Sequence, residues 1–268
     1  ILYNKAFVNL LARLDLPLQQ NFGIYLRDLF EEPNQIDNLI EDTINIGEFA
    51  SGEFKLKYGP EESAIWVHAI FNSTITDDYH EYVQITLHDI SMRRQQVEQL
   101  NKKAYTDKLT NLLNRRGAEK QINSLIQQQT DFALLLLDLN RFKPINDIYG
   151  HDVGDEMLIY VANQLIKSLR NSDIISRWGG DEFVVVLPHL NKKEVCDICQ
   201  NIKHHIEKPL FLADNNESVS VGVSIGVTFY PAERDSLSSL IKAADKAMYS
   251  LKESRSSEQF LAFYHDLD

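Results

Sequence analysis

Residues 173–188 read Asp-Ile-Ile-Ser-Arg-Trp-Gly-Gly-Asp-Glu-Phe-Val-Val-Val-Leu-Pro, two apolar runs separated by a pair of glycines. Glycine adopts positive φ at little steric cost, so Gly179-Gly180 predicts a tight turn and the flanking runs predict a β-hairpin. Asp181 and Glu182 come directly after the turn, at the start of an otherwise buried strand. Acids in that position need a compensating charge, and a divalent cation is a common one. Acids that simply face water at a hairpin tip are the alternative.

The hairpin lies in a region where amphipathic helices alternate with strongly apolar strands. Apolar residues at helical spacing predict helices over residues 153–169 and 191–206. Strands are expected at residues 132–137, 174–178, 183–187, 219–228 and 260–264. This order of elements predicts an α+β domain with helices packed on a sheet.

Residues 1–90 follow another pattern. Helices are expected at residues 4–14 and 33–46, and breakers at residues 59–60 and 76–78 separate the strand candidates, which are residues 52–58, 64–71 and 81–88. Helices followed by three antiparallel strands, the last ending at Asp89-Ile90-Ser91, resemble the later part of a PAS sensor domain. We therefore expect a PAS-like domain over residues 1–90, truncated at its N-terminal side.

The ligand of this sensor domain cannot be read from the sequence. A flavin-thiol photoreceptor is excluded, because no cysteine precedes Cys196. Haem binding through a strand histidine stays open beside ordinary packing or surface exposure, and the candidates are His68, His80 and His88.

A polar helix is expected between the two domains, over residues 91–106. Ile90, Val97 and Ala104 lie seven residues apart with Leu100 between them, a short heptad pattern. It suits a signalling helix that pairs weakly in a homodimer, and a solvated linker helix is the alternative.

Charge and hydropathy narrow the class of protein. Residues 1–92 hold fifteen acidic and five basic residues, so most of the net charge of −12 lies there. An acidic surface argues against nonspecific binding to nucleic acid or anionic lipid. No stretch has the roughly 18 to 20 apolar residues of a membrane span, and the start has no signal-peptide layout. We expect a cytoplasmic fragment of a longer protein, whose parent could be membrane-anchored upstream.

The two cysteines, Cys196 and Cys199, have C-x-x-C spacing. The apolar residues around them recur with helical period, which predicts that Cys199 packs in the core. A zinc site that recruits His204 or His205 is the alternative, but a structural zinc site normally needs a second ligand pair.

Four blocks in order along the chain resemble the GGDEF family of diguanylate cyclases. They are residues 107–116 (Asp-Lys-Leu-Thr-Asn-Leu-Leu-Asn-Arg-Arg), residues 138–155, the hairpin with Gly-Gly-Asp-Glu-Phe, and residues 243–249 (Ala-Ala-Asp-Lys-Ala-Met-Tyr). The resemblance covers about residues 105–256 and implies a cyclase domain over residues 107–268. It further implies a central, mostly antiparallel sheet flanked by helices, as in nucleotidyl cyclases and polymerase palms. The implied reaction condenses two GTP molecules into cyclic di-GMP and releases pyrophosphate.

The resemblance implies a role for each acid of the hairpin region. Asp138 and Asp181, with the backbone carbonyl of Leu139, would hold Mg²⁺ or Mn²⁺, for which carboxylates are suitable hard oxygen ligands. Asp181 or Glu182 would help to deprotonate the attacking 3′-hydroxyl.

Substrate and product contacts follow from the same blocks. Asn146 and Asp155 match the guanine readers, an amide for the carbonyl edge and a carboxylate for the N1–H and N2–H₂ donors. His151 could contact base or ribose, or pack. Arg170 and Asp173 match an R-x-x-D site where the product inhibits. The phosphates would meet backbone N–H groups and ammonium groups of Asn140, Arg141, Phe142, Lys143 and Lys252.

Two departures from the family pattern bear on these roles. Asn140 stands where the family often has a second aspartate. The Lys252 to Arg255 segment is one residue short and lacks a glycine, which puts GTP affinity in doubt. The open alternatives are a degenerate domain that only binds GTP or cyclic di-GMP, a dimerising sensor module that acts through protein contacts, and a cyclase acting within one nucleotide.

Overall fold

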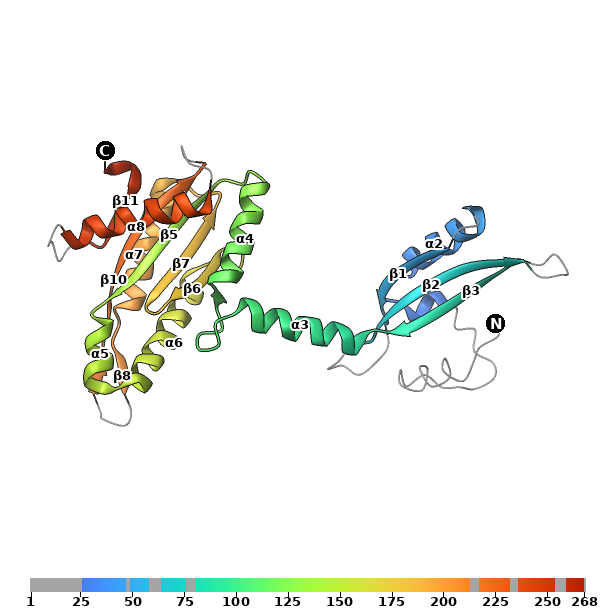
Figure 1. The fold of residues 1–268 in the computed structure, drawn as a ribbon, viewed down its shortest axis with the longest axis horizontal. Coiled ribbons are helices and arrows are strands. Elements are labelled where there is room, and N and C mark those ends of the chain that lie inside the picture. Colours follow the sequence, from blue (N-terminus) through green and yellow to red (C-terminus); the bar gives the residue numbers. More distant parts are fainter. Residues whose placement is uncertain are drawn as a thin grey trace. The chain divides into compact units, whose positions relative to one another are not determined.

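The computed structural model describes residues 26–46, 49–57, 64–75, 81–212, 217–231, 236–253 and 259–267. The chain divides into two compact units, one up to Leu100 and one from Asn101 (Figure 1). The helix expected at residues 4–14 and the breakers at 59–60 and 76–78 lie outside the described residues. Within the described ranges, no helix is both long and apolar enough to cross a membrane.

The first unit is a three-stranded antiparallel sheet with one packed helix. Its order is β1-β2-β3, formed by β1 (Ala50–Lys55), β2 (Trp66–Ile75) and β3 (Glu81–Asp89). A short 3-10 helix, η1 (Leu26–Leu29), precedes α2 (Pro33–Ile46). These elements confirm the three expected strands and the helix at residues 33–46. The core includes Phe30, Ile36, Val67 and Phe71, which are all fully buried. The PAS-like identity of this unit stays a prediction.

Helix α3 (Ser91–Tyr105) follows β3 and has no buried residue. Its large apolar side chains face solvent, with 72% of Met92, 49% of Val97 and 65% of Leu100 exposed. Ile90 lies before the helix and is buried. Of the residues in the heptad pattern, Val97 and Leu100 are therefore exposed, whereas Ile90 packs within its own chain.

The second unit is built on a six-stranded sheet of order β11-β10-β5-β7-β6-β4. The three central pairings are antiparallel, and the two edge pairings are parallel. This mixed arrangement confirms the mostly antiparallel sheet. The strands are β4 (Leu113–Asn114), β5 (Phe132–Asn140), β6 (Ile174–Gly179), β7 (Glu182–Pro188), β10 (Gly222–Tyr230) and β11 (Leu261–Phe263).

Helices cover both faces of this sheet (Figure 1). They are α4 (Arg115–Gln127), α5 (Phe142–Tyr149), α6 (His151–Ser168), α7 (Lys192–Ile206) and α8 (Leu237–Glu253), and a short 3-10 helix η2 (Tyr264–Asp266) follows β11. Strands β8 (Leu210–Leu212) and β9 (Glu217–Val219) form a separate two-stranded sheet.

The single strand expected at residues 219–228 is wrong. The structure ends β9 at Val219 and begins β10 at Gly222, and only β10 joins the six-stranded sheet. Alternating apolar residues run through both strands, so the pattern gave no sign of a break. At Gly222 the backbone lies close to Asn140, because a Cβ there would stand 3.3 Å from the Cβ of Asn140. This pairing also carries β5 three residues past its expected end.

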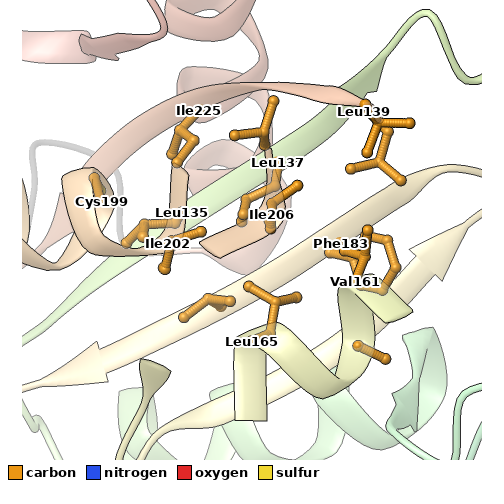
Figure 2. Close-up of a cluster of buried hydrophobic side chains, with 14 of the residues drawn as sticks. Leu135, Leu137, Leu139, Val161, Leu165, Phe183, Cys199, Ile202, Ile206 and Ile225 are labelled. Carbon is orange, nitrogen blue, oxygen red and sulfur yellow. The ribbon is translucent and has the colours of Figure 1, made fainter. Parts of the chain in front are cut away.

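Side chains alternate between the two faces of β5, and each face meets different helices. On one face Leu135 and Leu137 pack with α6 and α7 (Figure 2). Cys199 of α7 is part of that buried cluster, as the sequence predicts, and burial raises the pKa of its thiol. On the other face Leu134 and Leu136 pack with α4 and α8. Asp138 has the same parity as Leu136, so its side chain points to the α4 and α8 face.

Helix α8 lies directly against β10. A Cβ at Gly226 would clash with the carbonyl oxygen of Ala244 and would stand 2.7 Å from the backbone nitrogen of Met248. Since both obstacles are backbone atoms, a larger residue would push the helix off the sheet. This close contact sets the distance between α8 and the sheet, and therefore how far the polar side chains of α8 reach toward the strands.

Candidate active site

Three acids gather where β5 ends and β7 begins. Asp138 and Glu182 are direct register partners across the antiparallel pair, so their side chains lie on one face. The backbone N–H of Leu139 donates to the carbonyl oxygen of Asp181 at 3.3 Å, which ties the hairpin turn to the end of β5. Gly180 takes a φ of 53° in that turn, so the glycine pair acts as the sequence predicts.

A lysine from α8 completes this group. The Lys252 ammonium is 2.8 Å from Oδ2 of Asp138, whose side chain is 17% exposed. Lys252 and Asp245 are two helical turns apart on α8, so both side chains leave the same face of that helix. Arg255, the other basic residue of the expected phosphate site, lies outside the described residues.

The acids outnumber the cation, and this is visible at Glu182. Partial burial raises the pKa of Glu182, and the negative charges of three neighbours raise it further while Lys252 opposes them. The three neighbours are Asp138, Asp181 and Asp245. Excess negative charge on hard oxygen donors fits a divalent cation. Among the described residues, no three His, Cys, Asp or Glu side chains already converge as a metal cage, for zinc or any other metal.

The turn after β5 suits an anion. Arg141 adopts the left-handed conformation with a φ of 63°, and no side chain caps the first turn of α5. The free N–H groups of Phe142 and Lys143 therefore point to the start of the helix, which is a favourable place for phosphate. Phe142 is buried, so it offers its backbone only. The Asn140 side chain accepts a hydrogen bond of 3.1 Å from the Ser224 hydroxyl.

The two expected guanine readers come from adjacent helices. Asn146 lies in α5 and is half-buried, and Asp155 lies in α6 and is exposed. Gly154 packs against Asn146, because a Cβ at Gly154 would clash with Oδ1 of Asn146. His151, the first residue of α6, is exposed, so a packing role is not supported.

The R-x-x-D segment forms a closed turn away from these acids. The backbone N–H of Arg170 donates to Oδ2 of Asp173 at 2.8 Å, and the N–H of Asp173 donates to the Arg170 carbonyl at 3.0 Å. The Arg170 side chain is exposed. The turn thus presents a guanidinium outward, with a carboxylate held beside its backbone.

One ion pair next to the hairpin is not predicted by the sequence patterns. Arg177 donates from Nε to the carbonyl of Gly180 at 2.9 Å, and its Nη1 is 3.3 Å from Oδ1 of Asp107. Burial opposes ionisation of Asp107, but hydrogen bonds from Thr110 and the charge of Arg177 lower the pKa of Asp107 overall. Both partners stand in the quoted family blocks, but only the fold shows that they meet. The same holds for Asp245.

The raised pKa of Glu182 predicts a pH-dependent effect on the metal-free protein. A carboxyl whose pKa is raised on folding favours the native state below its ordinary value of 4.5, and this contribution is lost as pH rises through the folded value. Glu182→Gln should therefore raise the melting temperature at pH 7 in the presence of a chelator, and the gain should vanish toward pH 4. Calorimetry of both proteins across that range is the measurement, and an unchanged or lower melting temperature at pH 7 would contradict it.

This domain is similar to known proteins. Residues 104–258 fit the family model described as "Diguanylate cyclase, GGDEF domain". The response regulator PleD of Caulobacter vibrioides is 38% identical over 156 residues, which are 56% of this chain and 34% of PleD. Diguanylate cyclase DosC of Escherichia coli is 35% identical over 150 residues, which are 54% of this chain and 32% of DosC.

A solved structure shares the fold of this domain. The coiled coil and GGDEF domain of DgcB from Caulobacter crescentus, in complex with c-di-GMP, gives a TM-score of 0.57 at 27% identity, covering 65% of this chain and 93% of that one. The present chain spans about a third of the length of PleD and DosC. Because the family model matches more than half of the sequence, this chain belongs to the GGDEF diguanylate cyclase family of enzymes.

Proposed function

We propose that the chain is a diguanylate cyclase that condenses two GTP molecules into cyclic di-GMP. The observation that carries the proposal is the ion pair between Lys252 and Asp138. Asp138 is the register partner of Glu182, and it lies near the end of β5, just before the uncapped start of α5. A cation site and a triphosphate site are adjacent in this arrangement. The 3′-hydroxyl oxygen of one GTP bonds to the α-phosphorus of the other, pyrophosphate leaves with the bonding electron pair, and the step occurs twice.

The acids at the hairpin suit a magnesium or manganese ion. Asp138, Asp181 and the carbonyl of Leu139 would hold it, and such an ion neutralises the triphosphate and lowers the pKa of a hydroxyl. The hydroxyl proton goes to Asp181 or Glu182. Glu182 suits this role, since a carboxylate with a raised pKa is a stronger proton acceptor. Lys252 can exchange Asp138 for a phosphate oxygen when the substrate enters.

Asn146 and Asp155 read the guanine, and the turn from Asn140 to Lys143 holds the phosphates. The amide of Asn146 is fixed by its packing against Gly154. The carboxylate of Asp155 can accept from N1–H and N2–H₂, which adenine cannot offer together. His151 lies exposed at the start of the same helix, within reach of a base or ribose.

Two domains must pair, because one domain carries one GTP and the reaction joins two. The exposed apolar residues of α3, Val97 and Leu100, suit a helix that pairs with its copy. Residues 1–90 would act as a PAS-like sensor, and α3 would pass the state of this sensor to the paired cyclase domains. DgcB supports this layout, since its structure joins a coiled coil to a GGDEF domain.

Product is proposed to inhibit through Arg170 and Asp173. The exposed guanidinium of Arg170 can meet guanine or phosphate of cyclic di-GMP, and DgcB is a relative solved with that molecule. Arg170→Ala should relieve product inhibition without lowering the initial rate, because the turn lies away from the acids. Progress curves with and without added cyclic di-GMP measure this, and equal inhibition of both proteins would remove the assignment.

The deciding experiment is turnover of the purified chain with GTP and Mg²⁺, with cyclic di-GMP and pyrophosphate both quantified. Formation of one cyclic di-GMP per two pyrophosphates supports the proposal. Tight GTP or cyclic di-GMP binding without turnover would instead support a degenerate regulatory domain.

A further inference from the structure

A groove of about 470 Å³ lies beside the hairpin, on the side away from Asp138. In the sheet, β5 carries Asp138, whereas the groove is built from the ends of β4 and β6 and the start of α4. We call it the arginine groove, and its lining is Ala104, Asp107, Asn114, Arg115, Arg116, Arg177, Trp178, Gly179 and Gly180.

The three guanidinium groups of the arginine groove differ in how far they are compensated. Arg177 is paired with Asp107. Arg115 is paired with Glu119 at 2.9 Å and also stands 4.7 Å from the centre of the Trp178 ring. Arg116 is exposed and lies near the Tyr105 ring, and no ion pair among the described residues includes it. The groove therefore keeps a net positive charge on Arg116.

The arginine groove and Asp138 lie on opposite sides of the hairpin formed by β6 and β7. Gly179 and Gly180 line the groove and directly precede Asp181 and Glu182 in the sequence. Both glycines are exposed, and no atom stands within 4 Å of a Cβ placed on either of them. This part of the hairpin is therefore open to a ligand or to a second molecule.

The last turn of α3 also borders the arginine groove. Ala104 lines it, and Ala104 is seven residues from Val97, one of the exposed apolar residues of that helix. A helix that pairs with its copy along this stripe brings Ala104, and with it the groove, toward the partner domain.

We propose that the arginine groove binds the triphosphate of the GTP carried by the partner copy, with Arg116 as its principal contact. This rests on the proposed function. Two GTP molecules bring about eight negative charges together in one reaction, and a guanidinium is a strong partner for phosphate. On its own chain, each GTP has the α5 turn and Lys252. Arg116 would add the cation in trans, as the 3′-hydroxyl oxygen bonds to the α-phosphorus and pyrophosphate leaves.

The first test compares Arg116→Ala with Lys193→Ala, which removes the same charge from an exposed position on α7. Arg116→Ala should lower kcat for cyclic di-GMP by about tenfold or more, as for other groups that stabilise charge in a transition state. Affinity for a non-reactive GTP analogue, measured on monomeric protein, should stay unchanged. Lys193→Ala should match the parent, and Arg116→Lys should recover part of the rate. A parent-like rate for Arg116→Ala overturns the proposal.

The second test separates action in trans from action in cis. Heterodimers of an Arg116→Ala chain and a Glu182→Ala chain are isolated with two affinity tags and supplied with GTP. In trans, the GTP on the Arg116→Ala chain meets an intact groove and intact acids, so the linear dinucleotide should form as fast as in a parent and Glu182→Ala heterodimer. In cis, that half-site is impaired, and a rate as low as that of the Arg116→Ala homodimer overturns the proposal.

The two proposals fail in different ways. A parent protein that forms neither cyclic di-GMP nor the linear dinucleotide overturns the proposed function and this inference with it. A parent that makes cyclic di-GMP, together with a cis result, overturns the arginine groove alone. Melting temperatures of all variants check that each chain is folded.

Discussion

Asp181→Ala and Glu182→Ala should each lower cyclic di-GMP synthesis by at least about a hundredfold, because each removes a proposed metal ligand or the proposed base for the hydroxyl proton. Both side chains sit at a hairpin tip beside Asp138. Their removal lessens repulsion between like charges, so the fold should survive. The measurement is the initial rate at saturating GTP and Mg²⁺.

Asp197→Ala is the matched control, since Asp197 is an exposed acid on α7, away from the hairpin. It should leave the rate unchanged. If both hairpin variants keep more than about a tenth of the parent rate, the catalytic assignment is wrong. Circular dichroism and melting temperature show whether a loss of rate comes from unfolding.

The second large effect is expected at the proposed guanine-binding residues, Asn146 and Asp155. Asn146→Ala or Asp155→Ala should raise the KM for GTP by about tenfold or more, because a polar edge of the base is left without its partner. Inosine triphosphate lacks the N2 amino group. The parent should therefore prefer GTP to inosine triphosphate, and Asp155→Ala should lose most of that preference.

Two further variants sharpen this test. Glu156→Ala removes an exposed acid next to Asp155 and should behave as the parent. Gly154→Ala keeps every polar atom of the pair but places a methyl group against Oδ1 of Asn146, so it should also raise KM. An Asp155→Ala enzyme that uses GTP as well as the parent does would show that this carboxylate does not read guanine.

Local sequence patterns predicted many of the helices and strands. The helix over residues 33–46 could be predicted because Pro33 fits the first turn of a helix and the apolar residues follow a helical period. The hairpin could be predicted because two glycines interrupt a run of strand-forming residues. The break between Val219 and Gly222 could not, since the alternation of apolar residues continues through it.

The site divides in the same way. The acids at the hairpin and the turn after β5 lie within motifs that can be recognised in the sequence. The contact of Lys252 with Asp138 and that of Arg177 with Asp107 join residues far apart in the chain. Such pairs depend on strand order and on the depth of a helix on the sheet, which periodicity does not encode. The Gly226 contact with α8 is of the same kind.

The ion pair between Asp107 and Arg177 affects where a cyclase domain of this type can be separated from the residues that precede it. Asp107 lies only two residues after α3 ends, so a boundary drawn at the first strand of the sheet would discard it. Arg177 would then lose its counter-charge beside the hairpin. Its hydrogen bond to the Gly180 carbonyl would be weaker, because Asp107 would no longer hold the guanidinium in place. An isolated catalytic domain should begin upstream of Asp107, and low activity of a shorter one would reflect the loss of Asp107 rather than the loss of residues 1–90.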